Sequence, residues 1–413
     1  MLLAELAHSR STHSLEEGRR RPCASGLRAY FYPMLPALWW TCWLAWGMLP
    51  SGTWSAAVVP PPLGPARPLP LASRPASSPF LGYHRYRGLI GSLPVTVEVT
   101  VAPDGYAPRR SLACRGSYYY DRRGQPLSLQ AVRYQPQRPL VLQETVYLNE
   151  QAPTGQWRAT QPLGPRLTGT WDSADGQRHL PFVLREDYQG AVRYELLPTE
   201  RRGPRCLESE DHVNGPYATL RRDFVHLLGP DTLQPGLRRL QCPSPAARRV
   251  RVRRAVAACT YLYEWATVSF NGYNLLSVCT SQEETGFGRP HPSFRGAEQV
   301  YNLRTGQRVT LGQLLRPGTD SLLLQLLTPR LAQYVAEYFE QPVRPLTWEP
   351  HLPERGFGLS SEGLTFSYGE GDGVASWPCV GQDVVVPYAE LLPLLRPVSP
   401  LTPLLRERGL LLR

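Results

Sequence analysis

The chain contains no lysine and a single isoleucine, Ile90. Without lysine, it cannot provide a Schiff-base nucleophile, the phosphate-binding lysine of a P-loop or a Ser-x-x-Lys pair. All 45 basic residues are therefore arginine. This skew, together with 43 prolines, is typical of a GC-rich coding bias. The abundance of arginine and proline by itself therefore indicates no function.

Several motifs of catalytic and metal sites are also missing. The chain has no G-x-S-x-G, no H-E-x-x-H and no C-x-x-C, so the corresponding hydrolase and zinc chemistries are not indicated. We predict no catalytic residue, no metal and no cofactor. The alternative is a cell-wall-active enzyme whose site forms only in the fold, for example from His291 with Glu283 or Asp372.

Long apolar runs are confined to the N-terminal part. Leu35 to Leu49 form an apolar stretch of 15 residues, followed by Pro50 and by the small residues Ser55-Ala56-Ala57. This length fits a signal-peptide core better than a membrane span, which needs about 20 residues. We expect export to the periplasm, the cell surface or the medium of a bacterium, with anchoring by residues 35–49 as the alternative. The sequence leaves Met1 and Met34 open as the start.

The length of 413 residues allows two domains that each bury a core. The predicted division is an N-terminal extension with signal peptide or anchor (1–57), a Pro-rich linker (58–79), an all-β module (80–200), a connecting segment (201–254), an α+β domain (255–400) and a tail (401–413). The predicted fold class is thus mixed, an all-β antiparallel barrel or sandwich followed by an α+β domain.

The all-β prediction follows from short alternating segments. Valines at 95, 97, 99 and 101 alternate with polar residues, Asp175-Gly176 forms a hairpin turn, and a last strand is expected over 191–196. This region also contains five aromatic residues that are able to stack on sugars, although packing in a barrel core is the better explanation: Tyr118, Tyr119, Tyr120, Trp157 and Trp171.

The second region mixes strands with helices. The alternation over 260–268 predicts a strand, and Asn271-Gly272 predicts the turn into the next one. Thr319 and Asp320 cap one predicted helix, Thr328-Pro329 begins a second, and Pro387 begins a short helix near the end.

Cysteine and charge are unevenly distributed. Six cysteines follow the signal segment, and an even number in an exported chain suggests disulfides. The candidate pairs are Cys206–Cys242 and Cys259–Cys279, with buried free thiols as the alternative. From Cys259 onward 12 arginines face 15 acids, a net charge of −3. The basic run Arg248 to Arg254 lacks interleaved aromatics or a nucleic-acid module, so we predict no nucleic-acid partner.

Five segments of the second region resemble the DUF3298 family, found as the C-terminal domain of RsiV-type anti-sigma factors. They follow the family's order over about 150 residues. Departures lie at Phe287 and Arg289 and at Trp377-Pro378-Cys379. The matching segments are Leu276-Ser277-Val278, the loop from Thr285 to Pro292, Asn302 to Gly318, Phe357 to Phe366, and Val384 to Leu391. The first region is similar to β-rich modules of secreted bacterial proteins, through Gly88 to Thr96, Gly116 to Tyr120, Gly169 to Trp171 and Leu180 to Leu184.

The resemblance implies a non-enzymatic ligand-binding or sensing role at the cell wall. RsiV-type members bind lysozyme, so the implied partners are a lysozyme-like protein or a cell-wall glycan, and the membrane is contacted only through an uncleaved N-terminal segment. We expect no cytoplasmic sigma-binding domain, because the N-terminal extension is short, and we therefore expect the chain to bind but not to signal as an anti-sigma factor. The loop implied to bind the ligand contains Thr285, Gly286, Gly288 and His291.

Overall fold

The computed structural model describes residues 82–103, 112–146, 149–205, 217–228, 237, 260–285, 293–338, 342–346, 350–353, 356–368 and 382–411. All of these described residues belong to one compact unit. The predicted signal segment and Pro-rich linker lie outside the described residues. Within the described residues no helix has the length and apolar character needed to cross a bilayer.

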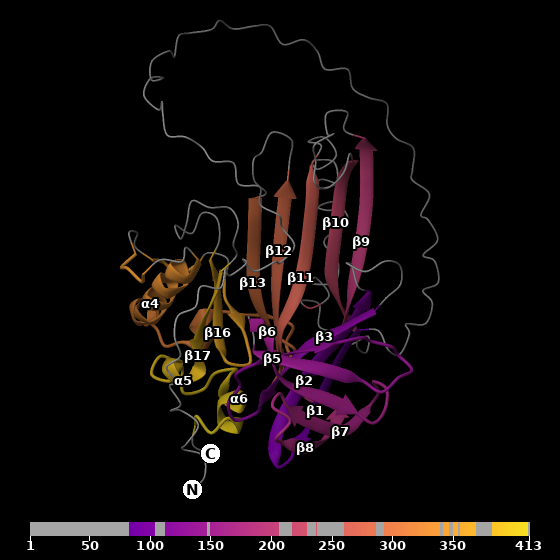
Figure 1. The fold of residues 1–413 in the computed structure, drawn as a ribbon. Coiled ribbons are helices and arrows are strands. Elements are labelled where there is room, and N and C mark those ends of the chain that lie inside the picture. The colour runs from indigo at the N-terminus through magenta and orange to yellow at the C-terminus, as the bar shows by residue number, and fades with distance from the viewer. Residues whose placement is uncertain are drawn as a thin grey trace, which may run out of the picture. The chain divides into compact units, whose positions relative to one another are not determined.

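The first region is a closed antiparallel barrel, which confirms the all-β prediction (Figure 1). Neighbouring strands pair in sequence order, and β1 pairs with β8 to close the barrel. The alternating valines of β2 point inward and are at most 2% exposed. The strands are β1 (Gly82–Ile90), β2 (Leu93–Pro103), β3 (Leu112–Tyr120), β4 (Leu127–Ala131), β5 (Val141–Val146), β6 (Asn149–Ala159), β7 (Arg166–Ser173) and β8 (His179–Glu186).

Two glycines, which begin two of the segments that resemble β-rich modules of secreted proteins, have a steric role in the barrel. A Cβ at Gly88 would collide with the backbone carbonyl of Val183, and one at Gly169 would collide with that of Arg158. Glycine in a strand interior often marks such a close backbone approach. These glycines therefore let adjacent strands cross tightly as the barrel closes.

The second region is built on a six-stranded sheet in the order β14-β13-β12-β11-β10-β9. Its strands are antiparallel neighbours except for the parallel pair β10 and β11. The strands are β9 (Arg193–Arg205), β10 (Tyr217–Leu228), β11 (Tyr261–Gly272), β12 (Leu275–Thr285), β13 (Ser293–Asn302) and β14 (Arg308–Val309).

The strand expected over 191–196 as the last of the barrel is instead the start of β9, in the six-stranded sheet. The barrel closes through β1 and β8, so a ninth strand finds no free edge there. The sheet of the second region consequently begins at Arg193, before the boundary expected at residue 200.

The hairpin turn between β11 and β12 lies two residues beyond the predicted Asn271-Gly272. Tyr273 and Asn274 form it, both with positive φ. Asn271 is held inside β11 because its side chain accepts from the Val192 amide at 3.0 Å and donates to the Val192 carbonyl at 2.7 Å. By contrast, the predicted turn at Gly176, with φ of 67°, is confirmed.

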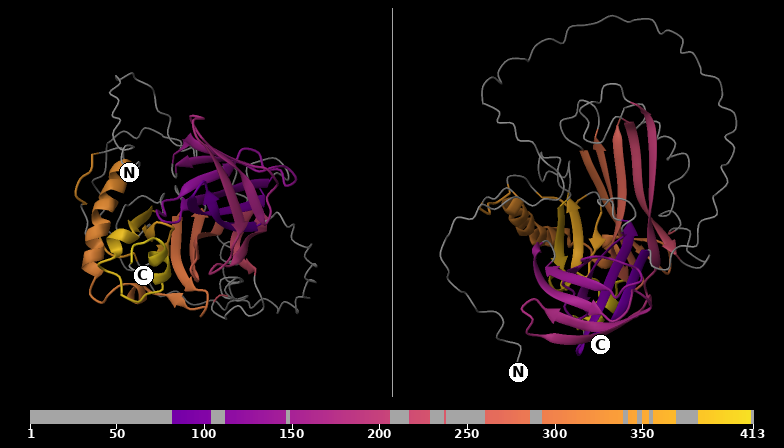
Figure 2. Two further views of the ribbon diagram at one scale, coloured as in Figure 1. Left: turned by 90° about the horizontal axis from the view of Figure 1, so that it is seen from below. Right: turned by 45° about the vertical axis from the view of Figure 1, so that its right-hand side comes forward.

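Among the described residues, a three-stranded sheet and four short or medium helices complete this region, in agreement with the α+β prediction. Helix α4 packs along β17 (Figure 2). Pro387 begins α5, as predicted. The elements are β15 (Gly358–Leu359), β16 (Gly363–Tyr368), β17 (Gln382–Pro387), α3 (Leu311–Leu314), α4 (Asp320–Tyr338), α5 (Tyr388–Leu391) and α6 (Thr402–Glu407).

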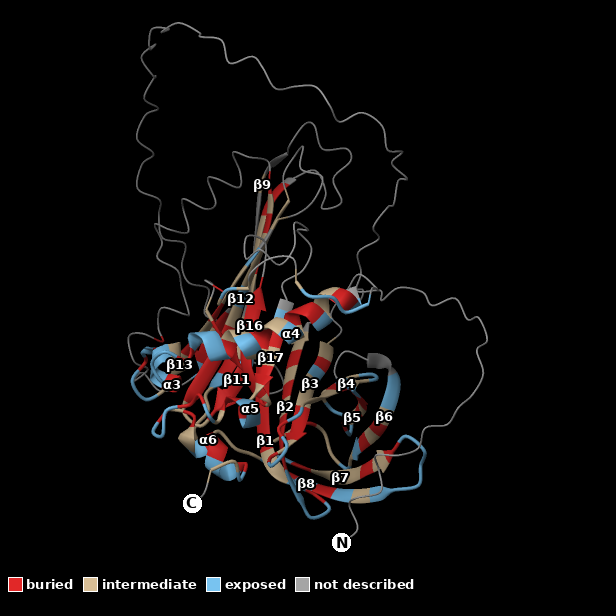
Figure 3. Ribbon diagram, turned by 90° about the vertical axis from the view of Figure 1, so that its left-hand side faces the viewer, coloured by how far each residue is buried: buried red, intermediate tan, exposed pale blue. Residues whose placement is uncertain are grey.

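Helix α4 is one continuous helix with Pro329 inside it, and the prediction of two helices is wrong. Leu323, Leu327 and Leu331 lie at intervals of four residues and are fully buried, so one apolar face spans the proline (Figure 3). Burial of this face offsets the hydrogen bond that proline cannot donate.

The last residues also belong to the core. Leu404 and Leu405 of α6 are at most 1% exposed and pack with the apolar residues of β15–β17. Residues 401–411 are thus part of the folded domain, although the sequence division treats 401–413 as a tail.

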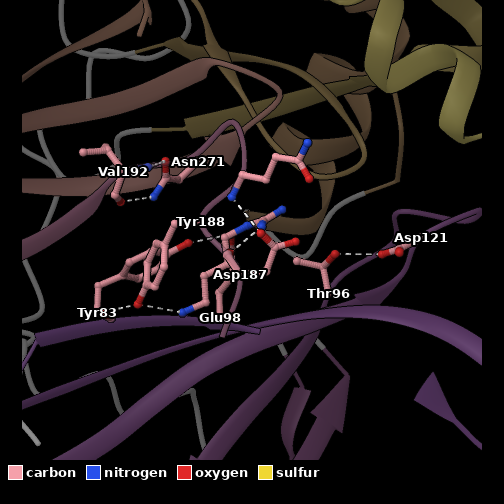
Figure 4. A network of polar contacts seen from close by, with 10 residues as sticks. Tyr83, Thr96, Glu98, Asp121, Asp187, Tyr188, Val192 and Asn271 are labelled. Carbon is pink, nitrogen blue, oxygen red and sulfur yellow. Dashed lines mark hydrogen bonds and ion pairs between the residues drawn. The ribbon is translucent and has the colours of Figure 1, made fainter. Parts of the chain in front are cut away.

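A buried polar network joins the barrel to the sheet (Figure 4). Tyr83 donates to Glu98 at 2.8 Å, and Arg85, which is 2% exposed, donates to the Asp187 carbonyl at 2.8 Å. The Asn271–Val192 pair continues the network onto β11. Burial raises the pKa of Glu98, while Arg85 opposes that rise.

Candidate functional site

One face of the six-stranded sheet presents a row of aromatic residues. Successive residues of a strand point to opposite faces, so Tyr261, Tyr263 and Trp265 of β11 share one face. They are half-buried, whereas Leu262 and Ala266 on the opposite face are buried. The rings of Tyr263 and Trp265 lie 4.8 Å apart, tilted by 32°. Part of each of these three side chains is thus exposed to solvent.

Charged residues of β10 flank the row. Arg221 and Asp223 pair in register with Tyr263 and Trp265. The Arg221 guanidinium lies 4.8 Å from the Tyr263 ring centroid, and the Tyr263 hydroxyl donates to Asp223 Oδ2 at 2.7 Å. Burial, reinforced by Asp223, raises the pKa of Tyr263, which keeps its hydroxyl neutral. Asp223 Oδ1 has no hydrogen-bond partner among the described residues.

Strand β12 supplies the other border. Tyr263 pairs with Glu283 and Trp265 with Ser281, which places Glu283 on the aromatic face and Glu284 on the opposite one. Burial raises the pKa of Glu283, partly opposed by a hydrogen bond from Thr285. We define Tyr261, Tyr263, Trp265, Arg221, Asp223 and Glu283 as the aromatic strip.

A buried acidic group lies further along the same face. Glu298 of β13 pairs in register with Cys279 of β12, and it is 1% exposed. Burial raises the pKa of Glu298 to about 8, and Asp383 of β17 adds to the rise. Burial and, to a smaller extent, the charge of Glu298 raise the pKa of the Cys279 thiol to about 11. A thiol with such a pKa remains protonated at neutral pH, and it is a poor nucleophile.

The predicted ligand loop is only partly described. Thr285 ends β12 opposite Tyr261, so it adjoins the aromatic strip. Gly286, Gly288 and His291 lie outside the described residues, as do the predicted enzyme partner Asp372 and the basic run Arg248 to Arg254. The sequence carried a signal that the prediction overlooked: in Tyr-Leu-Tyr-Glu-Trp, the aromatic residues recur at every second position.

The aromatic residues of the barrel are largely committed to its interior. Tyr118, Trp157 and Trp171 donate to the single oxygen Oε2 of Glu144, at 2.8, 3.1 and 2.7 Å. Thr154 donates to the other oxygen at 2.8 Å. Glu144 is 2% exposed. Core packing, the favoured explanation of these three aromatic residues, agrees with their inward position.

Tyr119 points the other way, and its ring contacts the Arg408 guanidinium at 5.7 Å. The barrel interior holds an apolar hollow of about 10 Å³, roughly the space of one water molecule. Side chains therefore fill the barrel and leave little room for a ligand. The hollow is lined by Val97, Val99, Leu140, Leu142, Trp157, Ala159, Leu167, Phe182 and Leu184.

The cysteine predictions have different outcomes. Cys114 and Cys279 are free thiols, so the predicted Cys259–Cys279 bridge is not formed. Cys279 pairs with Thr267, six residues from Tyr261 and therefore about 20 Å along the strand. Two further residues cannot bring Cys259 within the roughly 7 Å that a disulfide requires between Cα atoms. Cys206, Cys242 and Cys259 lie outside the described residues.

Among the described residues, no group of three His, Cys, Asp or Glu side chains is arranged to hold a metal ion. The features that these residues do bring together are the aromatic strip and the buried Glu298. An aromatic surface bordered by Arg, Asp and Glu is suited to binding, because tyrosine, tryptophan and arginine contribute most of the energy at protein interfaces.

Two solved structures of DUF3298 family proteins are similar to this chain. The one from Pseudomonas aeruginosa PAO1 is 18% identical, with a TM-score of 0.37, and the match covers 50% of this chain and 95% of that one. The one from Bacteroides fragilis NCTC 9343 is 13% identical, with a TM-score of 0.37, and the match covers 54% and 100%. No protein-family model and no curated protein sequence matches the chain.

Proposed function

We propose that this chain is a non-enzymatic binding protein exported to the bacterial envelope, and that a basic protein of the lysozyme type docks on its aromatic strip. The observation that carries the proposal is the row of Tyr261, Tyr263 and Trp265 beside Arg221, Asp223 and Glu283 on one sheet face. The resemblance to RsiV-type domains supports the choice of ligand.

Export is supported by the sequence alone. The apolar stretch 35–49, the small residues after it and the Pro-rich linker fit a signal peptide followed by a spacer. A retained anchor at residues 35–49 places the same binding face on the outer side of the membrane. Both versions bring the aromatic strip to where lysozyme meets the cell wall.

The acidic residues of the second region suit a basic protein ligand, although the whole chain carries a net charge of +11. Asp223 and Glu283 border the aromatic row, and the chain from Cys259 onward carries a net charge of −3. Opposite charge accelerates the encounter, while buried aromatic contacts supply most of the affinity. Affinity at this site is therefore expected to survive salt that screens the long-range attraction.

Calorimetry of the full chain with lysozyme at low and high salt tests the proposal. We expect saturable one-to-one binding that persists at about 0.5 M salt, where the Debye length is only a few ångströms. A second basic protein of similar size and charge is the control, and it should bind weakly and only at low salt. Absence of lysozyme binding, or binding that the added salt abolishes, contradicts the proposal.

A cell-wall glycan is the second candidate ligand, favoured by the spacing of the Tyr263 and Trp265 rings. Aromatic faces of this kind stack on sugar rings, and the flanking carboxylates accept hydrogen bonds from hydroxyl groups. Titration with a chitin oligosaccharide in the same calorimeter separates the two. Saturable heat with the oligosaccharide and none with lysozyme would replace the protein ligand by the glycan.

A further inference from the structure

The seam between the two sheets of the second region contains one buried carboxyl group in an unusual setting. Glu298 lies in the middle of β13, and its backbone bridges to Gly356, just before β15. The side chain is directed at Gly358 of β15, where a Cβ would collide with Oε2. The second sheet can therefore approach β13 this closely only because glycine occupies position 358.

One oxygen of this carboxyl group is not compensated by a hydrogen bond from the described part of the chain. Oε2 is buried and has no hydrogen-bond partner among the described residues. An ionised carboxylate in such a position loses its hydration without regaining equivalent hydrogen bonds, which is costly. A protonated carboxyl group avoids most of this cost.

The groups around Glu298 come from each element packed against it. Cys279 of β12 pairs with it, and the Cys279 thiol lies 3.8 Å from the Ser281 hydroxyl. From the second sheet, Asp383 of β17 adds a negative charge, while Ser367 of β16 favours the ionised form. Ser367 itself donates to Asp383 at 2.5 Å, so this hydroxyl interacts with the carboxyl groups of both Asp383 and Glu298.

A positively charged group lies near the backbone of Glu298. Arg308 of β14 reaches Gly356, next to the backbone carbonyl of Glu298. Burial has the largest effect on the pKa of Glu298, and it raises the pKa. Asp383 raises it further, while the hydrogen bond with Ser367 lowers it. Since burial and Asp383 both oppose ionisation, the packed seam favours the protonated acid.

We propose that Glu298 is a proton-dependent latch, which must hold a proton for β15–β17 to stay packed on β12 and β13. Opening of the seam exposes the carboxyl group to water, where it releases the proton. The seam borders the aromatic strip, because Cys279 is two residues from Ser281, the partner of Trp265. Proton loss thus loosens the face of the sheet next to the strip, whatever ligand binds there.

The sign of the pH dependence follows from linkage. The pKa of Glu298 is about 8 in the packed seam and close to its ordinary value of 4.5 when exposed. Between these values the packed state binds more protons than the open state, so the open fraction rises with pH, by up to about tenfold per unit. Below about pH 4.5 and above about pH 8, the ratio of open to packed molecules no longer changes through the ionisation of Glu298.

Hydrogen exchange of the full chain, followed by mass spectrometry from pH 5 to pH 9, tests the latch. After correction for the intrinsic pH dependence of exchange, protection of peptides from 358–368 and 382–387 should fall by about fivefold to tenfold per pH unit between pH 5.5 and pH 7.5, and then level off. Peptides from β2 in the barrel provide the internal control, and their corrected protection should stay constant.

Two variants decide the outcome. Glu298→Gln keeps the shape of the side chain and cannot ionise, so its seam peptides should lose the pH slope. Asp383→Asn removes the opposing charge, so the slope should level off at a lower pH than in the wild-type chain. Parallel pH profiles of the wild-type chain and Glu298→Gln, or an unshifted profile in Asp383→Asn, overturn the proposal. Neither readout depends on a ligand, so failure of the latch is distinguishable from failure of the proposed function.

Discussion

At the scale of single residues, Glu144 organises the barrel interior. Its carboxylate accepts four hydrogen bonds from three strands and is buried among aromatic rings. A buried charge of this kind is tolerated only because its partners satisfy it. The same partners depend on Glu144, because the Trp157 and Trp171 indole groups can only donate.

Truncation at this position should therefore be costly. Replacing Glu144 with alanine leaves three buried donors without an acceptor, and we expect the free energy of unfolding to fall by about 3–5 kcal/mol. Glu144→Gln retains one acceptor oxygen and should cost clearly less. Urea unfolding followed by tryptophan fluorescence measures both. Equal stability of Glu144→Ala and the wild-type chain would show that these hydrogen bonds contribute nothing.

Only part of the packing inside the barrel could be predicted from the sequence. The inward packing of Tyr118, Trp157 and Trp171 was expected, because a closed barrel needs large apolar side chains. The role of Glu144 was not, since its partners lie 10 to 27 positions away in the sequence. Pairing of this kind depends on strand register, which a single sequence does not specify.

At the scale of elements, tertiary contacts decided the structure where they conflicted with local sequence signals. Pro329 predicted a helix boundary, but the buried face through Leu323, Leu327 and Leu331 kept α4 continuous. Asn271-Gly272 predicted a turn, but the buried amide of Asn271 is needed for the contact with Val192. In both cases tertiary contacts outweighed a local preference of about 1–3 kcal/mol.

The helix also offers a matched pair of leucines. Leu327 is fully buried and Leu322 is 46% exposed on the same helix. We expect Leu327→Ala to lower the free energy of unfolding by about 2–5 kcal/mol, and Leu322→Ala by well under 1 kcal/mol, because only the first leaves a cavity. Chemical denaturation monitored by circular dichroism gives both values. Similar losses for the two variants would contradict the assignment of the buried face.

At the scale of the whole molecule, the barrel and the second region are joined by side chains distant in sequence. Arg87 of β1 pairs with Asp121 at 3.0 Å and with Glu407 of α6. The Arg408 guanidinium lies between Tyr119 of the barrel and Tyr388 of α5, with ring-centroid distances of 5.7 and 5.6 Å. The sequence predicted two regions and their fold classes, but this junction depends on residues up to 320 positions apart.

The aromatic strip, too, could be predicted from the sequence only in part. The alternation of β11 was predicted from the sequence. The parallel pairing of β11 with β10, which brings Arg221 and Asp223 beside Tyr263, links segments 40 residues apart. The charged border of the strip could be recognised only once that pairing was known.

The most direct test of the proposed function is lysozyme binding by a strip variant. Trp265→Ala should weaken binding by about tenfold or more, the effect of removing a central aromatic residue from an interface. Val398→Ala, at a side chain 85% exposed and outside the strip, is the control and should bind like the wild-type chain. Circular dichroism confirms that both variants are folded. Undiminished affinity of folded Trp265→Ala would show that the aromatic strip is not the binding site.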